Sequence, residues 1–266
     1  MRSYFTFNGH DSKDFGIWIE YLPDASFPER RGEAYQIAGK NGTQWCEEGT
    51  FENVEQAYKI WYRDWTGGKD MYHAGDDIAN WLIGSSGYCR LEDTYNSETF
   101  RLARFAGPLD FQTTLRKFGR GTLVFDCLPQ RYLKTGETAV TLMENVTLSS
   151  NLNATQTTAT LSNPYAFPAK PILRITGTGN VGISSENTVN GEMMVITVAL
   201  GDTETTVTID CDSYDINVIP AAVSYDSDYP ILTTLQPGVN TFSTIPVTTN
   251  PGTIKKLEVI PRWWTL

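Results

Sequence analysis

The sequence is poor in residues that catalysis and metal binding commonly need. Among its 266 residues there are only two histidines, His10 and His73, and each lies beside turn-forming residues. A metal cage or a Ser-His-Asp triad would have to be built around one of them. The chain also has no Gly-x-Ser-x-Gly, His-Glu-x-x-His or P-loop motif. The sequence therefore predicts no catalytic, cofactor-binding or metal-binding residue and no cofactor, and we expect the protein not to be an enzyme.

Cysteine is scarce as well. The four cysteines are widely spaced and form no Cys-x-x-Cys pair, which argues against a disulfide framework and against a zinc site. They are Cys46, Cys89, Cys127 and Cys211. We expect buried free thiols, with a Cys89–Cys127 disulfide as the alternative, because both of these residues lie in apolar, strand-like stretches.

Basic charge and long apolar runs are also lacking. The chain has 21 Lys and Arg against 31 Asp and Glu, a formal net charge of -10, so no global field draws it to nucleic acid or to anionic lipid. No apolar run approaches the roughly 18 to 20 residues of a membrane helix, and the first residues lack the apolar core of a secretion signal. These absences predict a soluble protein made in a cytoplasm, with no specific nucleic-acid binding and no membrane association.

Two groups of residues resemble ligand-binding sites in their sequence, one a dinucleotide site and the other a calcium site. Residues 177–182 match Gly-x-Gly-x-x-Gly after an apolar strand, but strand and turn residues follow where a dinucleotide site needs a helix N-terminus. We interpret this segment as a turn. Aspartates later in the chain could supply oxygen ligands to calcium, although the Gly-containing twelve-residue loop that would make such a site specific is missing. These are Asp210, Asp212 and Asp215, or Asp226 and Asp228.

What the sequence does contain is the pattern of a mainly β fold in two parts. Residues 1–135 carry most of the aromatic and charged residues, whereas residues 136–266 are rich in Thr, Ser, Asn and Val. This change in composition predicts two domains with that boundary, and each is long enough to bury a core.

The N-terminal domain is predicted to be an antiparallel β domain with one short helix. Residues 5–7, an Asn-Gly turn and the strand around Trp18 predict a hairpin. Residues 39–42, Gly-Lys-Asn-Gly, predict a second turn because glycine and asparagine adopt positive φ easily.

The helix of this domain is predicted at residues 76–84. Asp76 or Asp77 caps its N-terminus, an apolar stripe faces the core, and Gly84 ends it after about two turns.

The sequence of the rest of the domain predicts a β meander, in which alternating apolar residues give each strand one buried face. A turn is expected at residues 118–121, before a strand that buries Leu123, Phe125 and Cys127. Residues 52–65 fit the face of a helix as well as a strand, and the pattern does not decide between them.

The C-terminal domain is predicted to be a β-sandwich, because short apolar strands follow one another between Gly, Asn, Asp and Pro without a helical stretch. Trp263 and Trp264 are expected to pack into its core, and a platform for sugar stacking is the alternative. The residues thus leave open a second function, that of a stand-alone carbohydrate-binding β-sandwich module.

Several different short motifs are distributed along most of the chain. The most specific ones, residues 76–105 and 118–137, combine a helix, a Leu-x-Asp strand and a Phe-x-Cys-x-Pro-Gln-Arg ending. Residues 5–20 contain an opening hairpin, and residues 28–42 run from Pro-x-Arg to Gly-Lys-Asn-Gly. Residues 163–264 add Asn-Pro, Lys-Pro, Pro-Gly-x-Asn and Pro-Arg-Trp-Trp. Together these segments resemble the distal tail protein family of long, flexible-tailed bacteriophages.

The resemblance implies a structural distal tail, or baseplate hub, protein of a phage or prophage. The first domain would form a hexameric ring at the end of the tail tube, and the second would be a galectin-like or carbohydrate-module-like β-sandwich facing outward. The implied partners are further copies of the chain, the tail tube protein, the tail-associated hub protein, the tape measure protein and receptor-binding proteins. The implied place is the virion tail tip, assembled in the cytoplasm of the host bacterium, with a role in host attachment. On the resemblance alone, residues 52–65 are assigned to a strand.

Overall fold

The computed structural model describes residues 2–63, 71–115, 118–151, 153–187, 191, 193–213, 215–217, 222–225 and 234–266. The chain divides into two compact units, Met1–Tyr132 with Leu266, and Leu133–Thr265. Strands predominate in both units, and the described part of the chain contains a single α-helix. The predicted mainly β fold is therefore confirmed.

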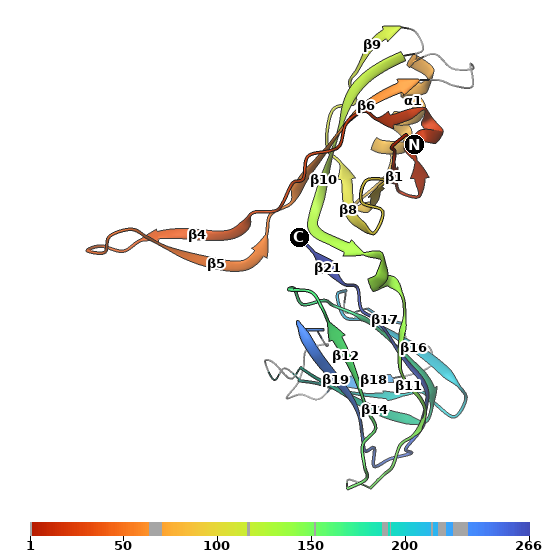
Figure 1. The fold of residues 1–266 in the computed structure, drawn as a ribbon. Coiled ribbons are helices and arrows are strands. Elements are labelled where there is room, and N and C mark those ends of the chain that lie inside the picture. Colours follow the sequence, from red (N-terminus) through yellow and green to blue (C-terminus); the bar gives the residue numbers. More distant parts are fainter. Residues whose placement is uncertain are drawn as a thin grey trace. The chain divides into compact units, whose positions relative to one another are not determined.

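The first unit is built on a curled antiparallel sheet (Figure 1). Its elements, in chain order, are β1 (Phe5–Phe7), β2 (His10–Asp11), the 3-10 helix η1 (Ser12–Phe15), β3 (Ile17–Ile19), β4 (Arg30–Gln36), β5 (Thr43–Phe51), β6 (Val54–Arg63), α1 (Met71–Ile83), β7 (Cys89–Asp93), β8 (Thr99–Phe105), β9 (Phe111–Leu115) and β10 (Phe118–Leu133). The strand order is β2-β1-β7-β8-β10-β6-β3, with β9 also paired to β10. β3, at one end of this order, also meets the segment before β1, because the Ile19 backbone N–H donates to the Ser3 carbonyl oxygen at 2.9 Å.

The first hairpin differs from the prediction. Asn8 and Gly9 have the positive φ angles expected of the Asn-Gly turn, 50° and 78°. However, β1 pairs with the short β2 and with β7, whereas β3, which contains Trp18, pairs with β6. The turn was predicted correctly but the partner strand was not, because η1 follows β2 and carries the chain to the other end of the sheet.

The helix α1 is longer than predicted. It begins by Met71, so Asp76 and Asp77 lie inside it and do not cap its N-terminus. Its end is as predicted, since the Gly84 backbone N–H donates to the Asn80 carbonyl oxygen at 3.2 Å. The acidic pair resembles a cap in the sequence, but the buried Ala74 shows that the helical face continues before it.

Two further segments of the first unit form strands, one left undecided by the pattern and one predicted as a turn. Residues 54–63 of the ambiguous segment form β6, which confirms the assignment to a strand over these residues. The turn predicted at residues 118–121 is wrong, because these residues open β10 and pair in register with β6, Phe118 opposite Arg63 and Gly121 opposite Ile60. Gly119 and Gly121 are residues typical of a turn, but their pairing with β6 keeps the backbone extended.

Aromatic side chains fill the core of the first unit. Phe5 stacks on Tyr58 and on Trp81, with ring centroids 5.1 and 5.7 Å apart. Phe125 meets Phe5 edge to face, as predicted for the buried face of that strand. The Trp81 Nε1–H donates to the Phe7 carbonyl oxygen at 3.0 Å, which fastens α1 to the sheet.

The second unit contains two antiparallel sheets packed on a shared apolar core. Its elements are η2 (Lys134–Glu137), β11 (Val140–Thr147), β12 (Thr158–Asn163), β13 (Ile172–Thr178), β14 (Asn180–Asn187), β15 (Met193–Ala199), β16 (Thr205–Asp210), β17 (Asp215–Asn217), β18 (Ala222–Tyr225), β19 (Gly238–Ile245), β20 (Thr253–Ile260) and β21 (Trp264–Thr265). One sheet has the order β11-β20-β13-β16-β17 and the other β12-β19-β14-β15-β18. This arrangement confirms the predicted β-sandwich.

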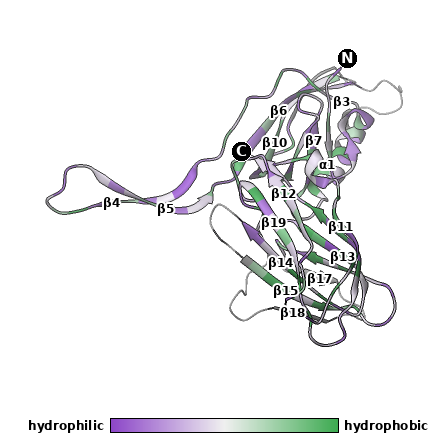
Figure 2. Cartoon of the chain, turned by 60° about the horizontal axis from the view of Figure 1, so that its bottom comes forward, coloured by the Kyte–Doolittle hydropathy of each residue, from purple (hydrophilic) through white to green (hydrophobic). Residues whose placement is uncertain are grey.

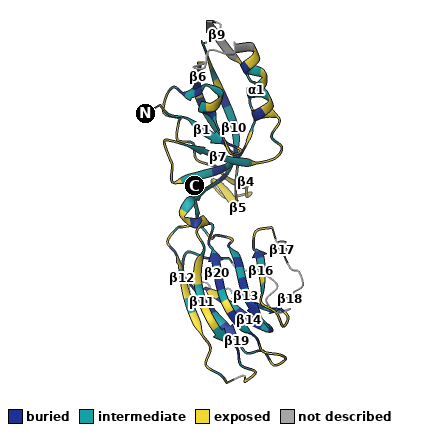
Figure 3. Cartoon of the chain, turned by 90° about the vertical axis from the view of Figure 1, so that its right-hand side faces the viewer, coloured by how far each residue is buried: buried dark blue, intermediate teal, exposed yellow. Residues whose placement is uncertain are grey.

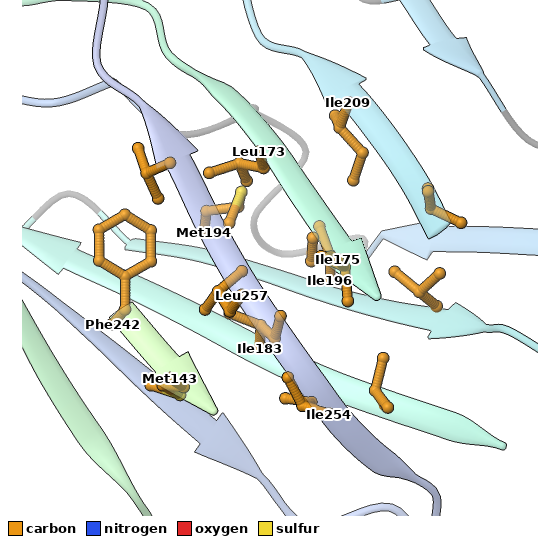
Figure 4. Packing of buried hydrophobic residues seen from close by; sticks show 14 of the residues in the cluster. Met143, Leu173, Ile175, Ile183, Met194, Ile196, Ile209, Phe242, Ile254 and Leu257 are labelled. Atoms are coloured by element: carbon orange, nitrogen blue, oxygen red, sulfur yellow. The ribbon is translucent and has the colours of Figure 1, made fainter. Parts of the chain in front are cut away.

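The core between these sheets is aliphatic (Figure 4). Leu173, Ile175 and Leu257 from one sheet face Ile183 and Phe242 from the other, and all five are fully buried. The burial alternates along the strands, as it does in β13, so each sheet presents one face to the other.

Candidate assembly surface

The most exposed element of the first unit is the hairpin of β4 and β5, which we call the arm (residues 30–51). These two strands pair only with each other, and Figure 1 shows no other element packed on either face. Nearly all of their residues are exposed, which Figure 3 shows in yellow. The tip is the predicted Gly-Lys-Asn-Gly turn, where Gly39 and Gly42 have φ angles of 83° and 84°. The base is closed by a hydrogen bond from the Glu52 backbone N–H to the Glu29 carbonyl oxygen at 2.8 Å.

The arm and the segment before it carry large apolar side chains at the surface. Trp45 is 52% exposed, although hydrophilic residues colour much of the arm in Figure 2. A Cβ on Gly32 would lie 2.7 Å from the Trp45 ring, so the glycine allows the indole to lie across β4. Most of the exposed large hydrophobic residues in the described chain belong to this stretch, namely Tyr21, Leu22, Phe27, Tyr35, Ile37 and Trp45.

Charged pairs link β4 to β5 and to Glu52, the residue that follows β5. Arg30 pairs with Glu47 at 2.7 Å, and Arg31 binds both carboxylate oxygens of Glu52 at 2.8 and 2.9 Å. All four side chains are about half exposed, so such pairs contribute little to stability. Because a lone two-stranded hairpin is only marginally stable in water, the exposed apolar residues and open strand edges of the arm are suited to a partner.

The described residues contain no cluster that resembles a metal site. No group of three or more His, Cys, Asp or Glu within them is placed to hold a metal ion. His10 lies on β2, exposed and 6.4 Å from the Phe15 ring, and His73 lies exposed on α1. Within the same part of the chain, no helix is long and apolar enough to cross a membrane.

The Gly-x-Gly-x-x-Gly segment is a connection between strands. Gly177 is the last residue but one of β13, Gly179 has a φ of 69°, and β14 begins at Asn180, where a dinucleotide site would need a helix. A Cβ on Gly177 would lie 2.2 Å from the Thr253 carbonyl oxygen, so this glycine allows two backbones to approach closely. The interpretation as a turn is confirmed at Gly179 alone, because the other residues of the segment belong to β13 and β14.

The aspartates considered for calcium have other partners where the structure describes them. Asp210 binds Arg262, and Asp212 pairs with Lys170 at 3.0 Å. The two carboxylates therefore pair with different cations of the chain. Outside the described residues lie the side chain of Asp215 and the whole of Asp226 and Asp228.

The chain is similar to known proteins in its structure but not detectably in its sequence. No protein-family model and no curated protein matches the sequence. Among solved structures, the one titled "Crystal Structure of SPP1 Dit (gp 19.1) Protein, a Paradigm of Hub Adsorption Apparatus in Gram-positive Infecting Phages" matches with a TM-score of 0.66 at 14% identity, over 100% of both chains. The chain has the fold of the SPP1 Dit protein. This confirms, for the fold, the resemblance found in the sequence.

Chains of the phage P2 baseplate share this Dit fold. In the activated conformation with Ca, one matches with a TM-score of 0.52 at 11% identity, over 93% of this chain and 98% of that chain. The corresponding structure with Sr gives 0.50 at 11% identity, over 91% and 97%.

The asparagines of the Asn-Pro and Pro-Gly-x-Asn motifs support the Dit fold from within the second unit. Asn163 donates from Nδ2 to the carbonyl oxygens of Phe167 and Leu235, both at 2.9 Å. Asn240 accepts the Gln236 backbone N–H at 3.0 Å and donates to the Gln236 carbonyl oxygen at 2.9 Å. These buried amides hold chain segments together, so their role is structural.

The Pro-Arg-Trp-Trp segment is also structural. Arg262, with a φ of 55°, binds Asp210 through both terminal nitrogens at 2.7 and 2.6 Å. Trp263 is buried in the sandwich core, and Trp264 stacks on Phe167 at 4.6 Å. The prediction that both tryptophans pack against the core is confirmed.

The cysteines only partly match the prediction. All four are free, so the alternative disulfide is not formed. Cys127 and Cys211 are buried as expected, and burial raises the pKa of each thiol to about 12. Cys89 is only half-buried, and Cys46 is exposed because β5 of the arm has no core to enter.

Proposed function

We propose that this chain is a structural distal tail protein, the baseplate hub, of a long-tailed phage or prophage. In this proposal six copies form a ring that joins the tail tube to the tail-associated and adhesion apparatus. The observation that carries the proposal is the match to the SPP1 Dit structure over the full length of both chains, which includes both units and the arm. A catalytic step is not part of this function.

Within this proposal, residues 1–135 form the ring and residues 136–266 form an outward-facing β-sandwich. The arm is the part of the first domain that favours self-association. Its two strands have open edges and exposed aromatic residues, and a second copy could cover both. A ring repeats this contact around its axis, so every arm in the closed assembly has a partner.

The partners that we propose are the tail tube protein on one side of the ring and the tail-associated hub protein on the other. The tape measure protein and receptor-binding proteins would meet the same assembly. The net charge of -10 favours such protein contacts over binding to phosphate backbones. The proposed location is the virion tail tip, after assembly in the cytoplasm of the host bacterium.

Light scattering across a size-exclusion peak, with negative-stain images of the same fraction, tests the ring. Six chains of 29.7 kDa give a particle of about 178 kDa, and the images are expected to show a central hole. A particle with the mass of one chain would contradict self-assembly of the isolated protein. Binding of that monomer to a glycan array would then favour the alternative, a carbohydrate-binding β-sandwich module.

A further inference from the structure

The sheet of the first unit carries a row of aromatic rings on the face opposite to its core. Trp18 of β3 lies opposite Trp61 of β6, and Arg120 of β10 lies opposite Trp61 from the other side. The two indoles stack with their ring centroids 6.2 Å apart, and Phe118 stacks on Trp61 at 6.3 Å. All three rings are partly exposed, and none packs against the core cluster that contains Tyr58. The row therefore faces outward from the sheet.

Cations surround this aromatic row. The Arg2 guanidinium lies over both indoles, at 5.7 and 5.4 Å from the two ring centroids. Lys59 lies two residues before Trp61 on the same face of β6, is exposed and has no ion-pair partner among the described residues. Arg120 pairs with Glu20 at 2.9 Å. We call this surface the cationic patch, namely Arg2, Trp18, Lys59, Trp61 and Arg120.

The arm has acidic side chains on one of its two faces. In the register of β4 with β5, Glu33 lies opposite Cys46 and Tyr35 lies opposite Gln44, so these side chains share a face. The Tyr35 hydroxyl donates to Glu33. That hydrogen bond is the main cause that raises the pKa of Tyr35, and the charge of Glu48 adds to it, so Glu48 lies near the same ring. We call this side of the arm its acidic face.

The two carboxylates of the acidic face are not neutralised within the arm. Neither Glu33 nor Glu48 forms an ion pair in the part of the chain that the structure describes. Arg31 lies near Glu48, but its guanidinium donates to both carboxylate oxygens of Glu52. The acidic face therefore keeps negative charge that a cation from another molecule can meet.

A ring of identical chains needs two different surfaces that fit each other, because each copy contacts one neighbour on either side. We propose that the acidic face of the arm docks on the cationic patch of the neighbouring copy. This proposal rests on the proposed self-assembly, and it names the surface that receives the arm.

The two surfaces complement each other in charge and in composition. Carboxylates beside the Tyr35 ring would meet cations beside two indoles, and aromatic residues and arginine are typical of the centre of an interface. Opposite charges also fix which surfaces meet, because like charges repel in the wrong arrangement. Trp45 lies on the other face of the arm, opposite Ala34, and that face stays open for a second contact in the ring.

Charge reversal in the whole protein tests this contact. Lys59→Glu changes the cationic patch and Glu48→Lys changes the acidic face, and both positions are exposed, so we expect both variants to fold. Light scattering over a dilution series gives the concentration at which half of the chains are assembled. Each variant alone is expected to raise this concentration about tenfold or more, because like charges then meet at the contact.

An equimolar mixture of the two variants separates the contact from a folding defect. In a ring of alternating copies, the new carboxylate of one variant meets the new ammonium of the other, and the unchanged Lys59 meets the unchanged Glu48. We expect the mixture to assemble within about threefold of the wild-type concentration. Lys255→Glu is the matched control, because this exposed lysine lies on β20 of the second unit. It is expected to assemble as the wild type does and not to rescue Glu48→Lys.

The same measurements distinguish failure of the contact from failure of the ring. If the wild type assembles and both variants alone assemble equally well, the contact is wrong and the ring stands. If the variants fail alone and also as a mixture, the contact is wrong, because the defect is then not one of paired charges. A monomeric wild type would contradict both proposals. A wild-type assembly of another size would contradict only the six-copy ring, and rescue by the mixture would still support the contact.

Discussion

The sandwich of the second unit and the arm of the first are both made of antiparallel strands, yet they bury very different shares of their side chains. In β13 every second residue is buried, whereas β5 is exposed along almost its whole length. The sandwich strands pack face to face on an aliphatic core, and the strands of the arm have only each other. Burial of apolar side chains therefore explains why the sandwich folds. The arm buries too little apolar surface for the same explanation to hold.

This difference separates two kinds of residue. Side chains in the sandwich stabilise the chain itself, so their loss lowers the free energy of unfolding. Side chains of the arm contribute little to folding, which agrees with the proposed role of the arm in assembly with another copy. Substitutions in the sandwich are therefore expected to lower stability, and substitutions in the arm to weaken self-association with little change in stability.

Phe242→Ala is expected to cause the largest loss of stability. The ring is fully buried in the sandwich core, and emptying such a site costs about 3 to 5 kcal/mol. Scanning calorimetry is expected to show a lower transition for the second unit and an unchanged one for the first. Val239→Ala, on the same strand and 42% exposed, is the control and is expected to cost less than about 0.5 kcal/mol. Equal effects of the two variants would contradict the assignment of the core.

Arg262→Met is expected to cause an intermediate and pH-dependent loss. Burial alone would raise the pKa of Asp210, but its bonds to Arg262 and to the backbone N–H groups of Asp212 and Ser213 outweigh burial and hold that pKa below its ordinary value. A lowered pKa means that the pair stabilises the fold above pH about 4 and that this contribution disappears as the pH falls further. Removing the pair is expected to cost about 2 kcal/mol at pH 7.

Urea unfolding of the wild type and the Arg262→Met protein, at pH 7 and at steps below pH 4, checks this prediction. The two curves are expected to converge at low pH, because protonated Asp210 no longer attracts the guanidinium. A difference in stability that stays constant over this range would show that the charge of Asp210 is not responsible.

Trp45→Ala is expected to change stability least, by less than about 0.5 kcal/mol, because the indole lies exposed on the arm. The same substitution is expected to weaken self-association, since a large aromatic residue contributes strongly to an interface. Light scattering over a dilution series measures the second effect and calorimetry the first. Thr43→Ala, also exposed on β5, is the control and is expected to leave both unchanged.

Local patterns predicted the parts of this fold that local chemistry controls. The Asn-Gly turn, the tip of the arm and the sandwich strands follow from turn residues and alternating apolar residues. The strands of the arm were not predicted, because exposed strands such as β5 show no such alternation. The turn predicted at residues 118–121 was wrong for a related reason. These residues pair with β6, a long-range contact, and the two glycines of the segment give no sign of that pairing.

The candidate site could be predicted only in part. The segment from Pro28 to Gly42 was identified by its resemblance to a family motif, and it contains β4 and the tip of the arm. The cationic patch left no trace in the sequence, because Trp18, Trp61 and Arg120 come together only through the pairing of β3, β6 and β10. The sequence also could not show that Trp61 lies outside the core. In a helix it would share a face with Tyr58, whereas in β6 the two side chains lie on opposite faces.

The most direct test of the account compares the wild type with a chain in which an Asn-Gly turn replaces the arm, residues 30–51. The hydrogen bond between Glu29 and Glu52 at the base of the arm shows that these two residues are close enough for a short turn to join them. Light scattering at one concentration is expected to give about 178 kDa for the wild type, six times its 29.7 kDa, and the mass of a single folded chain for the variant. A variant that still forms the ring would contradict the assembly role of the arm, and a wild type that stays monomeric would contradict the ring itself.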